Sequence, residues 1–315
     1  MKKGLLIGIL CVIIIAIITV FVFAFNGKKQ NKNDKLNVVV TTFSTYDFVR
    51  QIAGDTVNIN YLLGPGVDSH SFEPSSNDLI KIKNADMFIY IGGEMEKWVD
   101  KILGTDVITS KTELIKVTDC VETIEEQEVD GAEEHEEEEG AFDEHIWTSP
   151  KNAINMVNYL NNKLILSVPE NKEMYNKNAE SYIAKIEEVD SKIREIVNNK
   201  KRDRLVFGDK MPMQYFINEY GLKVSAAFNG CSTETEPSTK TITGLVERVK
   251  NDNIPVVLYI ELSTGKTAKT IAQECNVEAM QIQTLHNISK DDFNNGESYV
   301  SLMLRNLDVL RKALQ

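Results

Sequence analysis

The sequence predicts an α/β protein of two lobes, each with a mostly parallel sheet flanked by helices, joined by one long rigid helix and preceded by a membrane segment. Three observations predict this arrangement. Short apolar runs typical of buried strands alternate with helical patterns, both before residue 169 and after residue 200. Residues 169–200 form one uninterrupted amphipathic stretch, and residues 4–25 carry no charge.

The N-terminal segment has the length and flanks of a membrane span. Lys2 and Lys3 precede 22 uncharged residues, and about 20 residues cross the hydrocarbon of a bilayer. The cleavage motif at residues 22–24 is a marginal match, so the sequence favours an uncleaved anchor (1–30) over a cleaved signal. Cys11 is a weak candidate for lipid attachment, because the residue before it is not small. With the lysines inside, the rest of the chain is expected on the extracytoplasmic face of the cell membrane.

The part beyond the anchor is strongly acidic. The chain has a formal net charge of −12, and residues 1–30 carry four lysines and no acid, so the remainder carries −16. This charge argues against nucleic acid as a partner and suits the attraction of cations. Cys120, Cys231 and Cys275 lie in a compartment that permits a disulfide, and the sequence does not choose among their three pairings.

The N-terminal lobe is expected at residues 31–168. The predicted strands are 36–43, 57–63, 87–91, 107–108 and 114–117, and the predicted helices are 46–52, 78–84, 98–102 and 150–166. Residues 122–144 interrupt the pattern with 13 acidic residues, no Lys or Arg, and His135. We expect this acidic loop to be a flexible insertion. It is either a solvated spacer or a weak collector of cations near the site.

The linking helix is predicted at residues 169–200. Seven apolar side chains recur at steps of four and three, and no Gly or Pro interrupts the interior. About 30 residues at 1.5 Å each give a helix of roughly 45 Å, long enough to lie across two lobes. The C-terminal lobe follows at 201–315, with strands at 204–207, 222–228, 255–260 and 279–285 and helices at 215–220, 241–250, 268–275 and 299–314.

Four polar side chains stand near the ends of predicted strands or loops, two before the linking helix and two after it: His70, His145, Asp209 and His286. Parallel α/β sheets place their sites at the carboxyl ends of strands, and imidazole and carboxylate are ligands for divalent metals. Each residue also has an ordinary interpretation. A lone histidine is often a satisfied polar residue, and Asp209 is suited to cap a helix beginning near Pro212.

The motifs around these residues resemble those of the zinc and manganese solute-binding proteins of ABC importers. His70 in GVDSHSFEPSSND and His145 in DEHIWTSP match the first two ligand motifs of that family. Asp209 precedes YFINEYG, His286 precedes a G-x-x-Y motif at Gly296, and FNGCSTETEPS begins at residue 228. The resemblance covers nearly everything after the membrane segment. It implies one metal ion bound by His70, His145, Asp209 and His286 between two lobes.

The chain departs from the family pattern at several positions. Ser69 and Glu144 replace prolines that are usual before the first two ligands, which predicts looser loops. The acidic loop has only one histidine, whereas zinc-specific members carry several. Three imidazoles and one carboxylate favour Zn²⁺, with Mn²⁺ as the alternative. Glu73 and Glu261 are candidates for orienting the imidazoles, or are ordinary carboxylates.

The resemblance implies a receptor that captures Zn²⁺ and delivers it to an ABC permease in the membrane. We expect the protein to be a monomer. We also expect it to have no enzymatic activity, because four protein ligands leave no open coordination position on the metal. The alternative from another class is a secreted zinc hydrolase using Glu73 or Glu261 as base, although HExxH and G-x-S-x-G motifs are absent. A third alternative is an adhesin or scaffold without ion transport, for which the sequence offers no positive feature.

Overall fold

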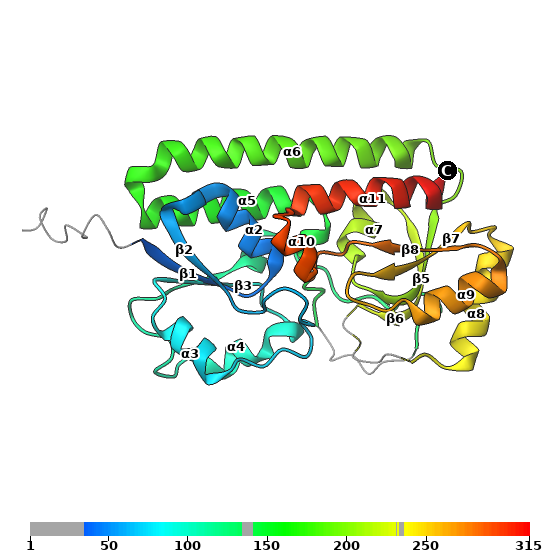
Figure 1. Cartoon of the computed structure of the whole chain (residues 1–315), viewed down its shortest axis with the longest axis horizontal. Helices are drawn as coiled ribbons and strands as arrows, with labels where there is room; N and C mark the ends of the chain where they lie inside the picture. Colours follow the sequence, from blue (N-terminus) through cyan, green and yellow to red (C-terminus); the bar gives the residue numbers. More distant parts are fainter. Residues whose placement is uncertain (1–34, 134–140, 231, 233–235) are drawn as a thin grey trace, which may run out of the picture. The chain divides into compact units, whose positions relative to one another are not determined.

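Two parallel sheets form the centres of the two lobes (Figure 1). The structure is a computed structural model that describes residues 35–133, 141–230, 232 and 236–315. The predicted anchor at 1–30, Cys11, His135 and Cys231 therefore lie outside the described residues. Among the residues that are described, no helix combines the length and the apolar character needed to cross a membrane.

Each sheet has four strands in the same relative order. The first contains β1 (Leu36–Val40), β2 (Val57–Tyr61), β3 (Met87–Tyr90) and β4 (Glu113–Lys116), in the order β2-β1-β3-β4. The second contains β5 (Arg204–Met211), β6 (Lys223–Asn229), β7 (Val256–Ile260) and β8 (Glu278–Ile282), in the order β6-β5-β7-β8. All of these pairings are parallel. The predicted two-lobe α/β fold is confirmed.

The helices flank these sheets. They are α2 (Phe43–Ala53), α3 (Ser76–Lys83), α4 (Lys97–Ile102) and α5 (Pro150–Ser167) in the first half, and α7 (Gln214–Tyr220), α8 (Thr239–Asn251), α9 (Lys266–Cys275), α10 (Lys290–Asn294) and α11 (Tyr299–Leu314) in the second. Side-chain caps begin several of them, for example Ser149 before α5 and Ser298 before α11. These caps fix where each helix begins and therefore where the preceding loop ends.

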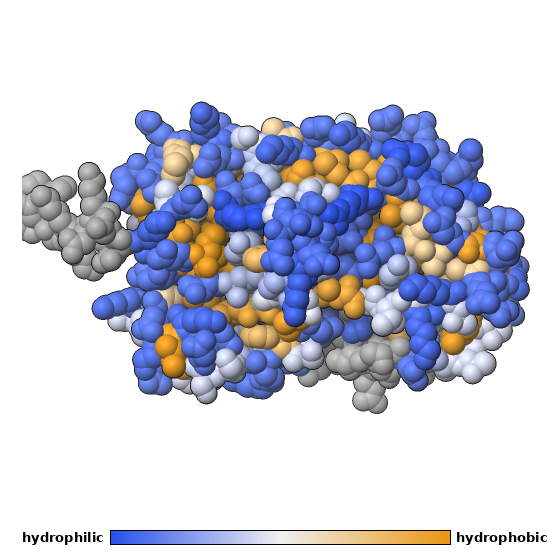
Figure 2. Space-filling model, viewed as in Figure 1, coloured by the Kyte–Doolittle hydropathy of each residue, from blue (hydrophilic) through white to orange (hydrophobic). Residues whose placement is uncertain are grey.

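The long helix α6 (Lys172–Asn198) is confirmed, and it lies along both lobes (Figure 1). Its 27 residues correspond to about 40 Å. All seven apolar residues that the spacing predicts to share a face are buried: Tyr175, Ala179, Tyr182, Ile186, Val189, Ile193 and Ile196. The helix contacts α2 and α5 from the first half of the chain and α11 from the second. Figure 2 shows hydrophilic residues along the outer edge of α6 and apolar residues in the seam below it.

Three sequence expectations are wrong in detail. Residues 107–108 are not a strand, since the chain there forms turns between α4 and β4. Residues 122–133 are not a free insertion, because Val129 is buried and Asp130 accepts hydrogen bonds from Arg204 and Ser225. The strand β5 continues to Met211 instead of ending at 207, with an irregularity in its pairing with β6 between Phe207 and Lys210.

Candidate metal site

Three histidines from the two lobes meet in one cluster. One ring nitrogen from each of His70, His145 and His286 lies within 4.8 Å of the others. The Nε2 atoms of His70 and His286 are 3.2 Å apart, and the ring centroids of His145 and His286 are 4.4 Å apart. His70 and His145 precede α6 and His286 follows it. The predicted convergence of the three imidazoles is therefore observed.

The fold explains how residues so distant in sequence come together. His70 lies in the loop that follows β2, and His286 follows β8 after a short connection. His145 immediately precedes a short 3₁₀ turn that leads into α5. The cluster therefore forms where loops at the carboxyl ends of strands in the two lobes face each other, the usual place for a site in a parallel α/β sheet.

His145 is held by Asp143. The Nδ1 atom of His145 lies 2.7 Å from Oδ1 of Asp143, and the backbone N–H of His145 donates to the same oxygen, also at 2.7 Å. Burial lowers the pKa of His145, but the Asp143 carboxylate outweighs burial and raises it above the ordinary value. With Nδ1–H donated to the carboxylate, Nε2 is the nitrogen left to bind. It is buried and has no hydrogen-bond partner among the described residues.

His286 is oriented by a chain of two side chains. Its Nδ1 lies 3.2 Å from the hydroxyl of Thr284, which donates in turn to the Glu261 carboxylate at 2.9 Å. Glu261 also accepts from the backbone N–H of His286 at 3.0 Å. The hydroxyl proton is directed to the carboxylate, so the hydroxyl oxygen accepts from Nδ1–H of His286. Nε2 therefore faces His70 with its lone pair.

The electrostatics of the cluster favour neutral imidazoles at two positions. Burial, followed by the neighbouring His145 and Lys210, lowers the pKa of His70 to about 3. Burial, His145 and His70 lower the pKa of His286 well below its ordinary value. At neutral pH these two rings are uncharged, which is the form that binds a metal ion.

Asp209 is not part of the histidine cluster. Its Oδ1 accepts from the backbone N–H of Lys210 at 2.9 Å, and its Oδ2 is buried without a hydrogen-bond partner among the described residues. It does not cap a helix either, since α7 is preceded by Met213 without a side-chain cap. Asp209 lies within β5, in the part of the strand where the pairing with β6 is irregular. The structure thus brings together three of the four predicted ligands.

The two carboxylates proposed to orient the imidazoles behave differently. Glu261 is buried and contacts His286 as described above, so that prediction is supported. The Glu73 side chain is 75% exposed and lies 3.9 Å from Lys101, so it does not orient a histidine. The expectation of a loosened second loop is also wrong. Glu144 is buried and its carboxylate accepts from the backbone N–H groups of Glu94 and Met95, which fixes the loop.

Sequence reasoning missed Asp143 and Thr284, the side chains that bind Nδ1 of His145 and His286. A local signal for both was present, because each stands two residues before its histidine, in D-x-H and T-x-H. That spacing allows a polar side chain to reach Nδ1 in a tight loop. Lys210, whose charge lowers the pKa of both His70 and His286, was missed as well. No sequence signal connected it to residues so far away.

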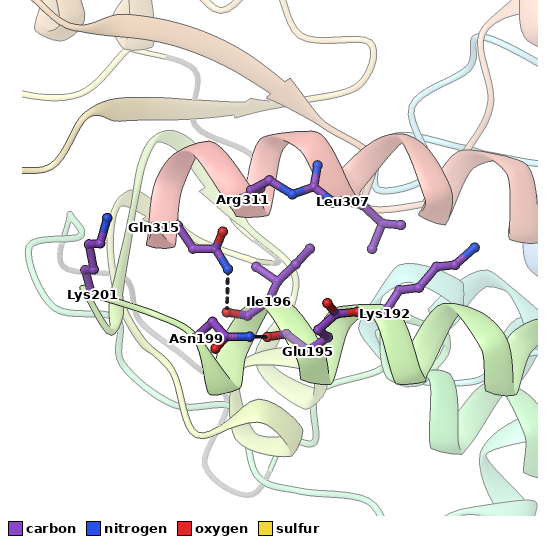
Figure 3. Close-up of a pocket in the computed structure, with 8 residues that line it drawn as sticks. All are labelled: Lys192, Glu195, Ile196, Asn199, Lys201, Leu307, Arg311 and Gln315. Carbon is purple, nitrogen blue, oxygen red and sulfur yellow. Dashed lines mark hydrogen bonds between the residues drawn. The ribbon is translucent and has the colours of Figure 1, made fainter.

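Two cavities of the protein differ in the kind of ligand that each could hold. The cavity beside the cluster is lined by His70, Lys210, Glu261 and His286 and has a volume of about 40 Å³. Organic ligands need several hundred cubic ångströms, so this space suits an ion or a few waters. A larger groove of about 640 Å³ lies between α6 and α11 and is lined by charged, amide and aliphatic side chains without histidine or cysteine (Figure 3). Glu195 is its one side-chain carboxylate, so the groove lacks the set of several ligands that holds a transition metal.

The described cysteines form no metal cluster and no disulfide. Cys120 and Cys275 are free thiols, and both are partly buried. Burial raises the pKa of the Cys120 thiol to about 11. At neutral pH it is therefore protonated and a poor metal ligand.

Comparison with known proteins identifies relatives along nearly the whole chain. The sequence is 34% identical over 316 residues to the zinc-binding lipoprotein AdcA of Streptococcus pneumoniae, covering 99% of this chain and 61% of that protein. This chain thus spans about three fifths of the length of AdcA. It is 31% identical over 293 residues to the high-affinity zinc uptake system protein ZnuA of Bacillus subtilis, covering 91% of this chain and 90% of that protein.

The fold agrees with these relatives. The crystal structure of the Zn(II)-bound ZnuA-like domain of S. pneumoniae AdcA superposes with a TM-score of 0.75 at 33% identity, covering 89% of this chain and 99% of that domain. A family model described as zinc-uptake complex component A, periplasmic, matches residues 38–313. Because that match spans both lobes and the three histidines, the chain belongs to the ZnuA family.

Proposed function

We propose that this chain is a membrane-tethered, extracytoplasmic receptor that binds one zinc ion between its lobes and delivers it to an ABC permease. The observation that carries the proposal is the convergence of His70, His145 and His286 from both sides of α6. The two relatives compared above are named a zinc-binding lipoprotein and a zinc uptake system protein, which supports zinc as the cargo.

Zinc fits the donor set. Zn–N bonds of about 2.0–2.1 Å in a tetrahedron place ligand nitrogens about 3.3 Å apart. The 3.2 Å between Nε2 of His70 and Nε2 of His286 agrees with this spacing. An ion at that point binds both lone pairs without a large movement of either ring. Three imidazoles suit zinc better than manganese, which prefers oxygen ligands, so Mn²⁺ is the second candidate.

Asp209 is our candidate for the fourth ligand. A buried carboxylate oxygen without a partner is costly, and a cation is one way to satisfy it. Binding through Asp209 requires its side chain to turn towards the three imidazoles. The set would then be the predicted one, with His70 and His145 from the first lobe and Asp209 and His286 from the second.

The geometry favours transport over hydrolysis. Glu261 accepts hydrogen bonds from Thr284 and His286 through both oxygens, and Glu73 is exposed and lies away from the imidazoles. Neither is available as a general base beside a metal-bound water. The acidic character of the chain favours a cation as partner and disfavours nucleic acid. We expect a monomeric receptor whose macromolecular partner is the permease.

Isothermal titration of residues 31–315 after chelation tests the proposal. We expect one Zn²⁺ per chain. Its affinity should fall by more than about a hundredfold in His70→Ala, His145→Ala and His286→Ala. Loss of a side chain that only hydrogen-bonds to a ligand already lowers metal affinity by about ten- to a hundredfold, and loss of the ligand itself should lower it further. Asp308→Ala is the control, since it removes an exposed side chain of α11 outside the cluster. Unchanged zinc affinity in the three cluster variants would contradict the proposal. Tighter binding of Mn²⁺ would replace zinc by manganese as the cargo.

A further inference from the structure

The residue after His286 joins the two lobes. Asn287 belongs to the second lobe and is almost completely buried, at 1% exposure. Its Nδ2 donates to the backbone carbonyls of Gly64 and Val67, both at 2.7 Å, and its Oδ1 accepts from the Tyr61 hydroxyl at 2.5 Å. All three partners belong to the first lobe. The side chain therefore makes these hydrogen bonds across the interface and beside the metal site.

The hydrogen-bonding capacity of this amide is fully used. Oδ1 also accepts from the backbone N–H of Ile288 at 2.7 Å, so Asn287 has two donors and two acceptors engaged. The opposite orientation of the amide would place an oxygen against two carbonyl oxygens. Aspartate would do the same, because a carboxylate has no donor. The site is thus specific for an asparagine amide.

Other contacts surround this amide on both sides. The backbone N–H of Gly66 donates to the carbonyl of Ile288 at 2.8 Å, which is another bond between the lobes. The ring of Tyr61 stacks on Tyr46 with centroids 5.3 Å apart, and Phe293 of α10 lies 5.4 Å from Tyr46 and 6.2 Å from Tyr61. The Tyr61 ring, whose hydroxyl bonds Asn287, therefore packs in an aromatic cluster that contains rings from both lobes.

The position of this contact links it to the ion. Residues 64–67 form the start of the loop that carries His70, and Asn287 is bonded through the peptide to His286. The side chain of Asn287 therefore ties the loop of one ligand to the neighbour of another, in parallel with the bridge that an ion between His70 and His286 would make. Separation of the lobes would have to break both connections.

We propose that Asn287, with Tyr61, is a latch that holds the lobes closed over the bound ion and sets the rate of its release. Asn287 acts as a positioning residue, through the loop of His70, and does not touch the ion. This inference rests on the proposed function. Because the latch forms only after the lobes approach, its loss should accelerate dissociation of zinc and leave association nearly unchanged.

The test compares Asn287→Ala, Tyr61→Phe and the control Asn161→Ala. Asn161 is also a buried amide, but it donates to Asn176 between α5 and α6, away from the contact between the lobes. Zinc dissociation is measured by capture with a chelator, and association by stopped flow. At about a factor of five for each hydrogen bond, we expect dissociation to accelerate about fivefold in Tyr61→Phe and tenfold or more in Asn287→Ala. Association should change by less than about twofold, and the control should release zinc at the wild-type rate.

Tyr61→Phe keeps the ring packing and removes one hydroxyl, so it tests the latch even if Asn287→Ala does not fold. The latch would be overturned, and the proposed function left standing, by either of two results. Tyr61→Phe could release zinc at the wild-type rate, or Asn161→Ala could accelerate zinc release as much as Asn287→Ala does. A wild-type chain that takes up no zinc would instead overturn the proposed function. Amide exchange of Gly66 gives a second reading, because the latch predicts faster exchange in Asn287→Ala than in the control.

Discussion

The hydroxyl of Tyr182 on α6 donates to Oδ2 of Asp47 on α2 at 2.5 Å, inside the protein. The same oxygen accepts from the backbone N–H of Tyr299 at the start of α11 at 2.9 Å. Oδ1 of Asp47 accepts from Arg50. One buried carboxylate thus connects the first lobe, the long helix and the second lobe.

Replacement of Asp47 should destabilise the whole protein. In Asp47→Ala the buried Tyr182 hydroxyl and Tyr299 N–H lose this acceptor, and the partly exposed Arg50 guanidinium keeps only the Glu297 carbonyl. Breaking such a network costs about 3–5 kcal/mol, which we expect in the free energy of unfolding by denaturant. Tyr182→Phe removes one of these bonds and should cost about 1.5–3 kcal/mol. Asp308→Ala, at an exposed position of α11, serves as the control. Equal stability of Asp47→Ala and this control would contradict the role.

Asp143→Ala should weaken zinc binding while leaving the fold intact. Without the carboxylate, Nδ1 of His145 loses its acceptor, so the ring is no longer fixed with Nε2 directed to the cluster. Loss of such an outer partner lowers metal affinity by about ten- to a hundredfold. Competition titration with a zinc chelator measures the affinity, and circular dichroism checks the fold. The Asp308→Ala control should bind zinc like the wild type. An affinity within twofold of the wild type in Asp143→Ala would exclude an orienting role.

The assignment of Asp209 is tested by Asp209→Asn. If the carboxylate binds the ion, zinc affinity should fall by about tenfold or more, and X-ray absorption should report a change in the oxygen ligand beside three nitrogens. Asp203→Asn is a suitable control, because Asp203 makes a surface ion pair with Lys223 outside the cluster. Unchanged affinity and an unchanged absorption spectrum in Asp209→Asn would assign the fourth position to another ligand.

Glu96→Gln should stabilise the protein at neutral pH. Burial raises the pKa of Glu96 above its ordinary value of 4.5, and Oε2 accepts from the backbone N–H of Gly92 at 2.7 Å. The folded state therefore favours the protonated carboxyl. As pH rises above about 4.5 the unfolded state loses this proton first, so Glu96 costs stability progressively. Glutamine stays neutral and avoids that cost.

Thermal unfolding between pH 4 and pH 8 measures this effect. The difference between Glu96→Gln and the wild type should be small at pH 4 and should grow with pH. Glu187→Gln, on the exposed face of α6, is the control and should show little growth. A difference that stays constant from pH 4 to pH 8 would contradict the assigned pKa direction.

Periodicity predicted the elements with a strong apolar pattern well. The buried face of α6 was predicted residue by residue. In a long amphipathic helix the apolar side chains repeat with the 3.6-residue period, so the sequence shows which residues face the core without knowledge of the helices that cover them. The extent of α11 was predicted at both ends, since Ser298 provides a cap and the apolar spacing continues to Leu314. The short helix α10 was missed, because five residues show too little periodicity.

The three clustered histidines could be predicted and most of their surroundings could not. His70 and His286 were found from motif and from their positions after strands, since a parallel sheet brings the carboxyl ends of its strands to one edge. His145, at the exit of the acidic loop, was found from its motif. Asp209 was expected in a loop, but hydrogen bonding with β6 extends β5 beyond it, which no local pattern of residues 208–211 shows. The contacts of Asn287 depend on how the lobes meet, and residues over 200 positions apart carry no shared local signal.

The uninterrupted backbone of α6 has a consequence for how the proposed receptor would release its ion. Without Pro or Gly among its 27 residues, this helix lacks the residues at which helices usually kink. We therefore expect separation of the lobes to bend α6 gently along its length. A bent helix tends to straighten again, so the lobes would separate only slightly and then close. A permease would then need to break only the few side-chain contacts between the lobes beside the histidine cluster to obtain the ion.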